Sequence, residues 1–155
     1  TTARAKEAVE ALLRVLLLKV PAQTVAPLML TVVNQRLIRK LCDECKEEFV
    51  PSPALLKKLG IPAGRVDHLY QPPTDEELPP CKACGGIGYS GRTSIFEVLK
   101  VDDSIREAMV KKPKLDVLRK VAKKAGHRTL QDEGILLVAQ GITSLAELSR
   151  VLKSS

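Results

Sequence analysis

At the start of the chain, apolar residues recur at the spacing of an amphipathic helix, with charged residues between them. The pattern predicts a helix over residues 3–20, which Pro21 ends because proline has no backbone N–H to donate. A second apolar segment covers residues 24–33. The alternating residues 35–41 then predict a strand that leads into a pair of cysteines.

The last part of the chain predicts one strand followed by helices. β-Branched and alternating residues indicate a strand over residues 93–99. Four helical segments follow, each bounded by a capping residue, a proline or a glycine. Their ranges are 103–111, 114–125, 129–140 and 144–152. Ser144, with Glu147 three residues later, indicates a capping box at the last of them.

The middle of the chain is rich in proline, which predicts mostly loop. One short helix is expected over residues 52–59, closed by Gly60. The predicted fold is mainly α with a small antiparallel β ribbon. The ribbon carries a four-cysteine subdomain, and a bundle of helices follows it.

All the cysteines of the chain fall into two Cys-x-x-Cys pairs. They are Cys42, Cys45, Cys81 and Cys84. Two such pairs supply the four thiolates that a structural zinc ion prefers, and the spacer between them is free to vary in length. Redox dithiols or disulfides are the alternative, which a chain without other secretory features disfavours. With four protein ligands no coordination position stays open, so we expect no catalysis at the metal.

Other candidate sites carry less chemistry. Residues 86–91 fit G-x-G-x-x-G, and residues 86–93 fit a phosphate-binding loop except that Arg92 replaces the lysine. Both motifs need a helix after the glycines, whereas a strand is predicted here. His68 and His127 lie at no ligand spacing from a cysteine, so they are interpreted as surface or packing residues.

Charge and hydropathy narrow the choice of partners. The 155 residues carry a net charge of +7, but lysine and arginine are spread along the helices and aromatic residues make up only 3%. Stacking on nucleic-acid bases is therefore disfavoured, and the basic residues are interpreted as solvated helix faces or as contacts to an anionic membrane surface or acidic partner. The apolar stretches fall short of the roughly 20 residues that a membrane span needs. We expect a cytoplasmic protein segment.

Two cysteine-containing segments and several tail segments resemble the ATPases of bacterial type II secretion and type IV pilus assembly, the GspE and PilB family. The first two are N-Q-R-L-I-R-K-L-C-D-E-C at residues 34–45 and C-K-A-C-G-G-I-G-Y-S-G-R-T-S-I-F-E-V-L at residues 81–99. The tail segments are residues 118–122, 126–130, 132–134 and 141–148. The resemblance spans nearly the whole chain, and its motifs occur in the order that is typical of the family.

The resemblance implies the C-terminal part of a homo-hexameric motor driven by Mg-ATP, peripheral to the inner membrane and in contact with a membrane platform protein. It divides the chain into residues 1–41 as the last elements of a RecA-like ATPase core, 42–92 as the zinc-binding subdomain and 93–155 as a strand and helical subdomain. The family's phosphate-binding and catalytic motifs lie upstream, so no catalytic or nucleotide-binding residue is assigned here, and the chain alone is expected not to hydrolyse ATP.

Two arginines are candidates for coupling within such a motor. Arg36 is hypothesised to sense nucleotide across a subunit boundary, with a salt bridge to Glu97 or another carboxylate as the alternative. Arg106, next to Ile105, lies in a region that resembles the coupling segment of retraction motors, with ordinary helix packing as the alternative. A different class also remains open, a stand-alone zinc ribbon that binds nucleic acid through its basic helices. Steep salt dependence of DNA binding would identify it.

Overall fold

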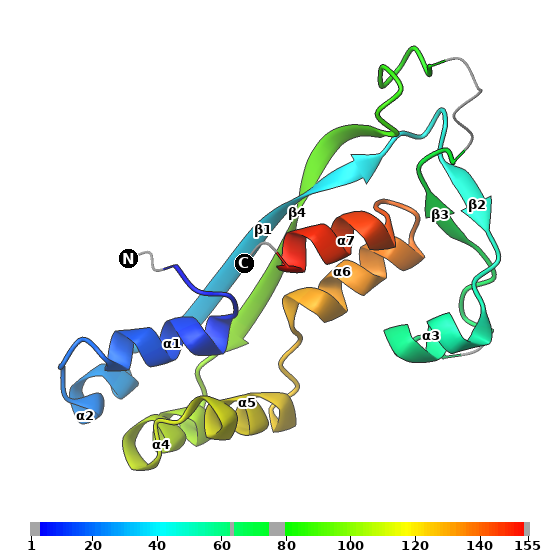
Figure 1. The fold of residues 1–155 in the computed structure, drawn as a ribbon. Coiled ribbons are helices and arrows are strands. Elements are labelled where there is room, and N and C mark those ends of the chain that lie inside the picture. Colours follow the sequence, from blue (N-terminus) through cyan, green and yellow to red (C-terminus); the bar gives the residue numbers. More distant parts are fainter. Residues whose placement is uncertain (1–3, 63, 75–79, 154–155) are drawn as a thin grey trace. The chain divides into compact units, whose positions relative to one another are not determined.

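The computed structural model describes residues 4–62, 64–74 and 80–153. Its elements, in chain order, are α1 (Ala8–Leu16), α2 (Ala22–Val25), the 3-10 helix η1 (Ala26–Leu28), β1 (Thr31–Leu41), β2 (Glu47–Phe49), α3 (Pro53–Leu59), β3 (Leu69–Gln71), β4 (Tyr89–Lys100), α4 (Asp103–Lys111), α5 (Leu115–Lys124), α6 (Leu130–Ala139) and α7 (Leu145–Lys153) (Figure 1). Within these described residues, the predicted combination of helices with antiparallel strands is confirmed, but the chain is mixed α and β, with two two-stranded sheets and not one small ribbon. The expectation that residues 1–41 are the last elements of a RecA-like core stays a prediction.

The chain forms two compact units. As far as they are described, one contains residues 4–35 and 96–130, and the other contains residues 36–95 and 131–153. Strands β1 and β4 pair with each other, and each contributes residues to both units.

The pairing of β1 with β4 is antiparallel. Just before β1, the carbonyl of Leu30 accepts a hydrogen bond from the N–H of Val101 at 2.9 Å, and just after β1 the N–H of Cys42 donates to Gly88 at 3.0 Å. Both strands are longer than the sequence pattern predicts. In β1, the β-branched residues that precede residue 35 continue the alternation of half-buried and exposed positions.

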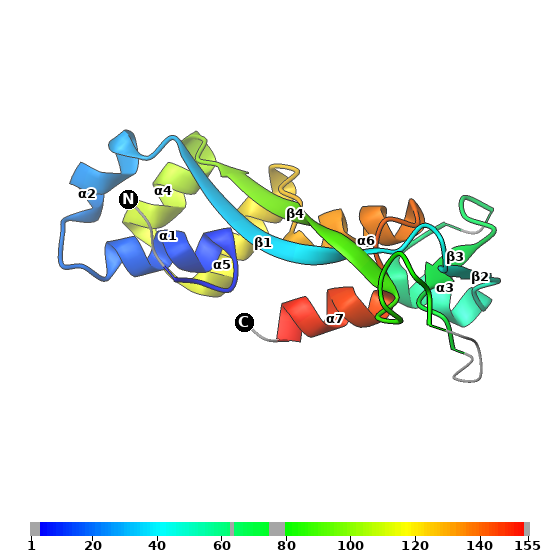
Figure 2. The ribbon, with the colours of Figure 1, turned by 90° about the horizontal axis from the view of Figure 1, so that it is seen from above.

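Aliphatic packing forms the core of the first unit. Helix α1 contacts α5, and α4 contacts α5, α2 and η1; Figure 2 shows α1, α4 and α5 gathered together. No aromatic residue belongs to the core cluster among the described residues, as the scarcity of aromatics in the sequence implies. Its buried members are Ala8, Val9, Leu12, Ala26, Leu99, Val101, Ile105, Ala108, Met109, Leu118 and Ala122.

The predicted extent of the first helix is wrong at both ends. Helix α1 begins at Ala8 and ends at Leu16, well before Pro21. Leu17 and Leu18, which the apolar pattern included, are 70% and 71% exposed. Lys19 adopts a left-handed conformation with φ of 62°, so the chain turns there.

The second unit contains the short helix α3 where the sequence predicts it. The hydroxyl of Ser52 accepts a hydrogen bond from the N–H of Leu55 at 3.2 Å, and Gly60 ends the helix with φ of 69°. The sequence analysis missed the antiparallel pair β2 and β3, in which Glu48 lies opposite Tyr70. Strands of three residues are too short for alternation to be recognised.

Helices α6 and α7 approach closely at Gly134. A Cβ atom at this position would lie 2.2 Å from Cδ1 of Leu148, which is itself buried. Glycine normally weakens a helix relative to alanine. Gly134 is therefore explained by the contact with α7 and not by helix propensity.

We expect Gly134→Ala to lower the free energy of unfolding by about 1–3 kcal/mol, because the added methyl group overpacks the contact with Leu148. Helix propensity alone would give a change of opposite sign. Chemical denaturation measures the difference, and the double variant Gly134→Ala, Leu148→Ala tests its cause. If the second substitution relieves none of the cost of the first, the close approach is not the reason for the glycine.

Candidate metal centre

Two tight turns bring the cysteines together. Cys42 follows β1 directly, and its carbonyl accepts hydrogen bonds from the N–H groups of Cys45 and Lys46 at 3.3 and 2.9 Å. Cys81 and Cys84 lie in the turn before β4, where the carbonyl of Cys81 accepts from Gly86 at 3.2 Å. Each turn is closed by its own backbone, so each presents two sulfurs on one side.

The spacing of the sulfur atoms fits a tetrahedral zinc ion. The Sγ atoms of Cys42 and Cys81 lie 4.0 Å apart, those of Cys45 and Cys84 lie 3.7 Å apart, and all four lie within 4.8 Å of one another. Zinc–sulfur bonds of about 2.3 Å in a tetrahedron separate the sulfurs by about 3.8 Å. Disulfide bonds would require about 2.05 Å, and all four cysteines are free.

The thiols differ in how readily they ionise. Burial raises the pKa of Cys45 above its ordinary value, and hydrogen bonds with the neighbouring thiols raise it further. Burial also opposes ionisation of Cys84, but the N–H of Gly88 donates to its Sγ at 3.3 Å, and this bond with others brings the pKa of Cys84 down to about 7. Cys84 is therefore the readiest of this pair to act as a thiolate ligand near neutral pH.

Gly88 allows the second turn to fold in this way. Its φ is +76°, and a Cβ atom would lie 2.6 Å from Cβ of Pro72. A side chain at this position would push Pro72 away and disturb the N–H that points at Cys84. The glycines lead into strand β4, as the sequence predicts, whereas a phosphate-binding loop leads into a helix.

Hydrogen bonds fasten the strands next to the cysteines to the turn between α6 and α7. The N–H of Leu41 donates to the carbonyl of Ile142 at 2.9 Å, and the hydroxyl of Thr143 donates to the carbonyl of Arg39 at 2.8 Å. On the other strand, the hydroxyl of Tyr89 bonds that of Ser144 at 2.7 Å. The ends of both strands are thus held by one turn.

A buried ion pair completes this attachment. Glu147 is 1% exposed, and its carboxylate accepts from the backbone N–H of Arg39 at 3.1 Å and from its guanidinium at 2.7 and 2.9 Å. Arg150 donates two further bonds to the same carboxylate at 2.7 and 2.8 Å. The guanidinium of Arg39 also lies 4.3 Å from the centre of the Tyr89 ring. These hydrogen bonds compensate the free-energy cost of burying the charged carboxylate of Glu147.

Only half of the predicted capping box forms. The hydroxyl of Ser144 accepts from the N–H of Glu147 at 3.1 Å, as expected. The carboxylate of Glu147 bonds the arginines instead of returning to the N–H of Ser144. The sequence pattern identified the right residue and missed its main partners, because Arg39 is remote in the chain.

A second buried carboxylate, Glu97, lies in the first unit and is 1% exposed. It accepts from the N–H of Ala8 and the amide of Asn34 at 3.0 Å each, and it bonds Nε2 of His127 at 2.9 Å. The imidazole is 6% exposed, so His127 is a packing residue, as the sequence predicts. The hypotheses about Arg36 stay predictions.

Comparison with known proteins identifies the family of this chain. The sequence model of a family described as type II/IV secretion system protein matches residues 1–150. The chain belongs to this family. A protein named type IV pilus assembly ATPase PilB from Thermus thermophilus is 34% identical to it over 149 residues, which cover 95% of this chain and 16% of that protein.

Relatives named for pilus assembly and for type II secretion match comparably well. The type IV pilus assembly ATPase PilB from Pseudomonas aeruginosa is 35% identical over 156 residues, covering 99% of this chain and 26% of its own length. The type II secretion system ATPase E from Vibrio cholerae is 35% identical over 127 residues, which cover 82% of this chain and 24% of that protein. This secretion-family chain therefore spans about a quarter or less of the length of these relatives. No described helix is both long enough and apolar enough to cross a bilayer.

We expect the purified chain to contain one zinc ion, measured by elemental analysis. The double variant Cys45→Ser, Cys84→Ser should lose it, because serine is a much poorer zinc ligand than a thiolate. Asp43→Ser, in the same turn as Cys45 but without a ligand atom in the cluster, should keep it and serves as the control. Folded protein that carries no metal would contradict the expectation.

The stability that the Glu147 ion pair contributes should depend on pH. Hydrogen bonds from Arg150 and Arg39 outweigh burial and lower the pKa of Glu147 from 4.5 to about 2. The folded state therefore favours the charged form by about 3 kcal/mol, and this stabilisation is complete above pH 4.5 and lost as the pH falls towards about 2.

Glu147→Gln should lower the free energy of unfolding at neutral pH by about this amount, and the difference between the two proteins should shrink as the pH falls through that window. Denaturation at a series of pH values measures it. Acid-driven loss of metal affects both proteins alike and cancels in the difference. A difference that is constant with pH would show that the charge of Glu147 does not contribute.

Proposed function

We propose that this chain is the C-terminal coupling and assembly region of a hexameric ATPase that powers type II secretion or type IV pilus assembly. The family match over residues 1–150 carries the proposal, together with the roles for which the relatives are named. The catalytic machinery would lie in the longer parent protein. Mg-ATP and the homo-hexamer belong to that parent, and no residue described here is given a role in hydrolysis.

We further propose that Zn²⁺, held by the thiolates of Cys42, Cys45, Cys81 and Cys84, organises the middle of the chain. The sulfur spacing supports this, and four protein ligands make the ion structural. Closing the long spacer with metal contributes on the order of 10 kcal/mol of apparent folding free energy. That amount is sufficient to order a proline-rich segment with two three-residue strands and one short helix.

The proposed division of the chain assigns residues 1–41 to the end of the RecA-like core, 42–92 to the zinc-binding subdomain and 93–155 to the strand and helices that follow. Strands β1 and β4 support a coupling role, because each contributes residues to both compact units. A displacement of one unit would therefore act on the other through continuous backbone. The partner would be a platform protein of the inner membrane, with the motor at its cytoplasmic face.

The test uses the full-length protein with Cys45→Ser and Cys84→Ser. We expect it to lose zinc and to lose secretion or pilus assembly, while its upstream part still binds ATP. Nucleotide binding, hexamer formation and ATP turnover, measured on the same preparation, separate a failure of assembly from a failure of coupling. Asp43→Ser is the matched control and should behave as wild type.

Normal transport by a full-length protein shown to lack zinc would refute the structural role of the metal. The nucleic-acid alternative is tested on the same chain by titrating generic duplex DNA at several salt concentrations. A protein that neutralises several phosphates binds with a steep negative dependence on salt. We expect no such binding even at low salt.

A further inference from the structure

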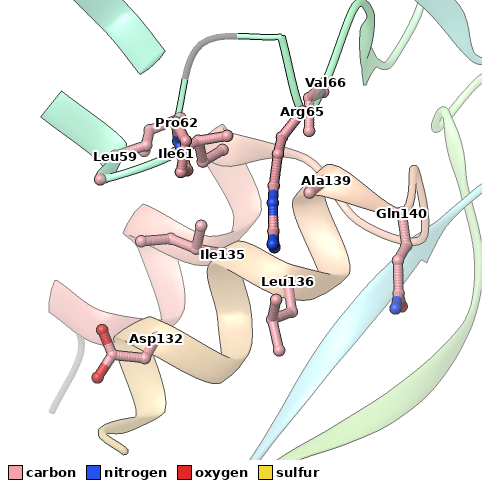
Figure 3. A pocket seen from close by; sticks show the side chains of 11 residues that line it. Leu59, Ile61, Pro62, Arg65, Val66, Asp132, Ile135, Leu136, Ala139 and Gln140 are labelled. Carbon is pink, nitrogen blue, oxygen red and sulfur yellow. The ribbon is translucent and has the colours of Figure 1, made fainter. Parts of the chain in front are cut away.

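Helices α3 and α6, both in the second unit, form the two sides of a pocket of about 420 Å³. The end of α3 and the loop after it supply one wall, and one face of α6 supplies the other (Figure 3). The volume falls in the range of about 300–1,000 Å³ that is typical of ligand pockets. Its lining residues are Leu59, Gly60, Ile61, Pro62, Arg65, Val66, Asp132, Ile135, Leu136, Ala139 and Gln140.

The floor of the pocket is aliphatic. Ile61 and Val66 face it from the loop after α3, and Ile135, Leu136 and Ala139 face it from α6. Leu136 is 40% exposed, although it belongs to a helix whose opposite side is buried against α7. An aliphatic surface that stays accessible inside a concave site gains free energy when another apolar group covers it.

Arg65 supplies the one cation among the residues that line the pocket. Figure 3 shows its side chain extending from the loop towards Ile135, Leu136 and Ala139. Within residues 4–62, 64–74 and 80–153, no carboxylate forms an ion pair with its guanidinium. The guanidinium therefore offers bidentate donors directly above an apolar floor.

Charge around the pocket indicates what kind of group fits. Lys57 and Lys58 lie in the last turn of α3, next to the lining residue Leu59, and make the end of this helix basic. The one acidic lining residue, Asp132, lies on α6 at the side away from Arg65. An extended anionic surface such as a lipid bilayer would meet this carboxylate, whereas a single acidic side chain beside Arg65 would not.

We propose that this pocket receives a short segment of a partner protein in which aliphatic side chains fill the space between α3 and α6 and a neighbouring Asp or Glu pairs with Arg65. Such a segment needs aliphatic residues and an acidic residue within one helical turn of each other. In other complexes, a helix likewise lays its apolar face into a groove. The pocket contains none of the cysteines, so this interaction is a separate proposal from zinc binding and from the proposed motor function. Its α3 wall lies in the segment that the metal is proposed to order, so the test uses protein that retains its zinc.

The experiment places the photoreactive residue p-benzoylphenylalanine at position 136 of the full-length protein in its own cells, with irradiation and mapping of the adduct by mass spectrometry. Position 136 tolerates the change because Leu136 is partly exposed. We expect an adduct on a different protein, within about one helical turn of an Asp or Glu. Arg65→Glu should reduce the adduct yield about tenfold or more, and Arg65→Lys should retain most of it.

Matched controls separate the pocket from the general charge of this face. Lys58→Glu makes the same change of charge on an exposed residue outside the pocket lining and should reduce the yield much less. The photoreactive residue at position 50, where Val50 is 74% exposed and outside the lining, should not give the same adduct. Replacing the mapped acid of the partner by lysine should restore the yield in the Arg65→Glu protein.

Several outcomes would overturn the proposal. They are the absence of any protein adduct, an adduct only with lipid, an adduct only with this chain or a second copy of it, and an adduct whose yield does not change in Arg65→Glu. An unchanged thermal unfolding profile of each variant shows that the substitution has not acted by unfolding the protein. Since the readout is an adduct and not transport, its failure is distinguishable from a failure of the proposed function.

Discussion

Four sulfur atoms within 4.8 Å of one another cannot all ionise unless a cation lies among them. Their environments already differ, since the pKa of Cys45 is raised and that of Cys84 is lowered to about 7. A bound divalent ion would bring all the thiols to the thiolate form and turn their mutual repulsion into attraction. The two turns that carry the cysteines are built to bring the sulfurs together. Gly88 lets one turn approach, and the backbone of each turn fixes the direction of its sulfurs.

A two-stranded ribbon is marginally stable by itself in water, so the order of β1 and β4 depends on what holds their ends. In the second unit the ends are held by the turn between α6 and α7, through Glu147 and Arg39. In the first unit Glu97 on β4 takes donors from Asn34 on β1, from His127 and from the first turn of α1. Each end of the ribbon is therefore fixed by one buried carboxylate, which would be costly if it lost its donors.

Local signals predicted much of the fold. Ser52 and Gly60 bound α3 as expected, and the cysteine spacing identified the cluster. Helix α4 occupies the predicted range 103–111, and the carboxylate of Asp102 caps it by accepting from the N–H of Ile105 at 2.9 Å. Features that depend on distant residues were not predictable. The partners of Glu147 and Glu97 come from segments far away in the chain. The early end of α1 was missed for a different reason, since the apolar pattern continues through Leu17 and Leu18 although the chain turns at Lys19. Periodicity reports which face of an element is apolar and says nothing about which polar groups meet inside.

In the proposed coupling role, the chain would pass movement between its two units, and its apolar and polar contacts would respond differently to such movement. Aliphatic contacts, which fill the core of the first unit, have no preferred direction and tolerate sliding. Charge-assisted hydrogen bonds such as those of Glu147 have defined geometry and resist it. Because these bonds lie where β1 and β4 meet the α6–α7 turn, force along the ribbon would be met by directional contacts beside the cysteines. A metal ion bound by the cysteines next to that junction would stiffen it further.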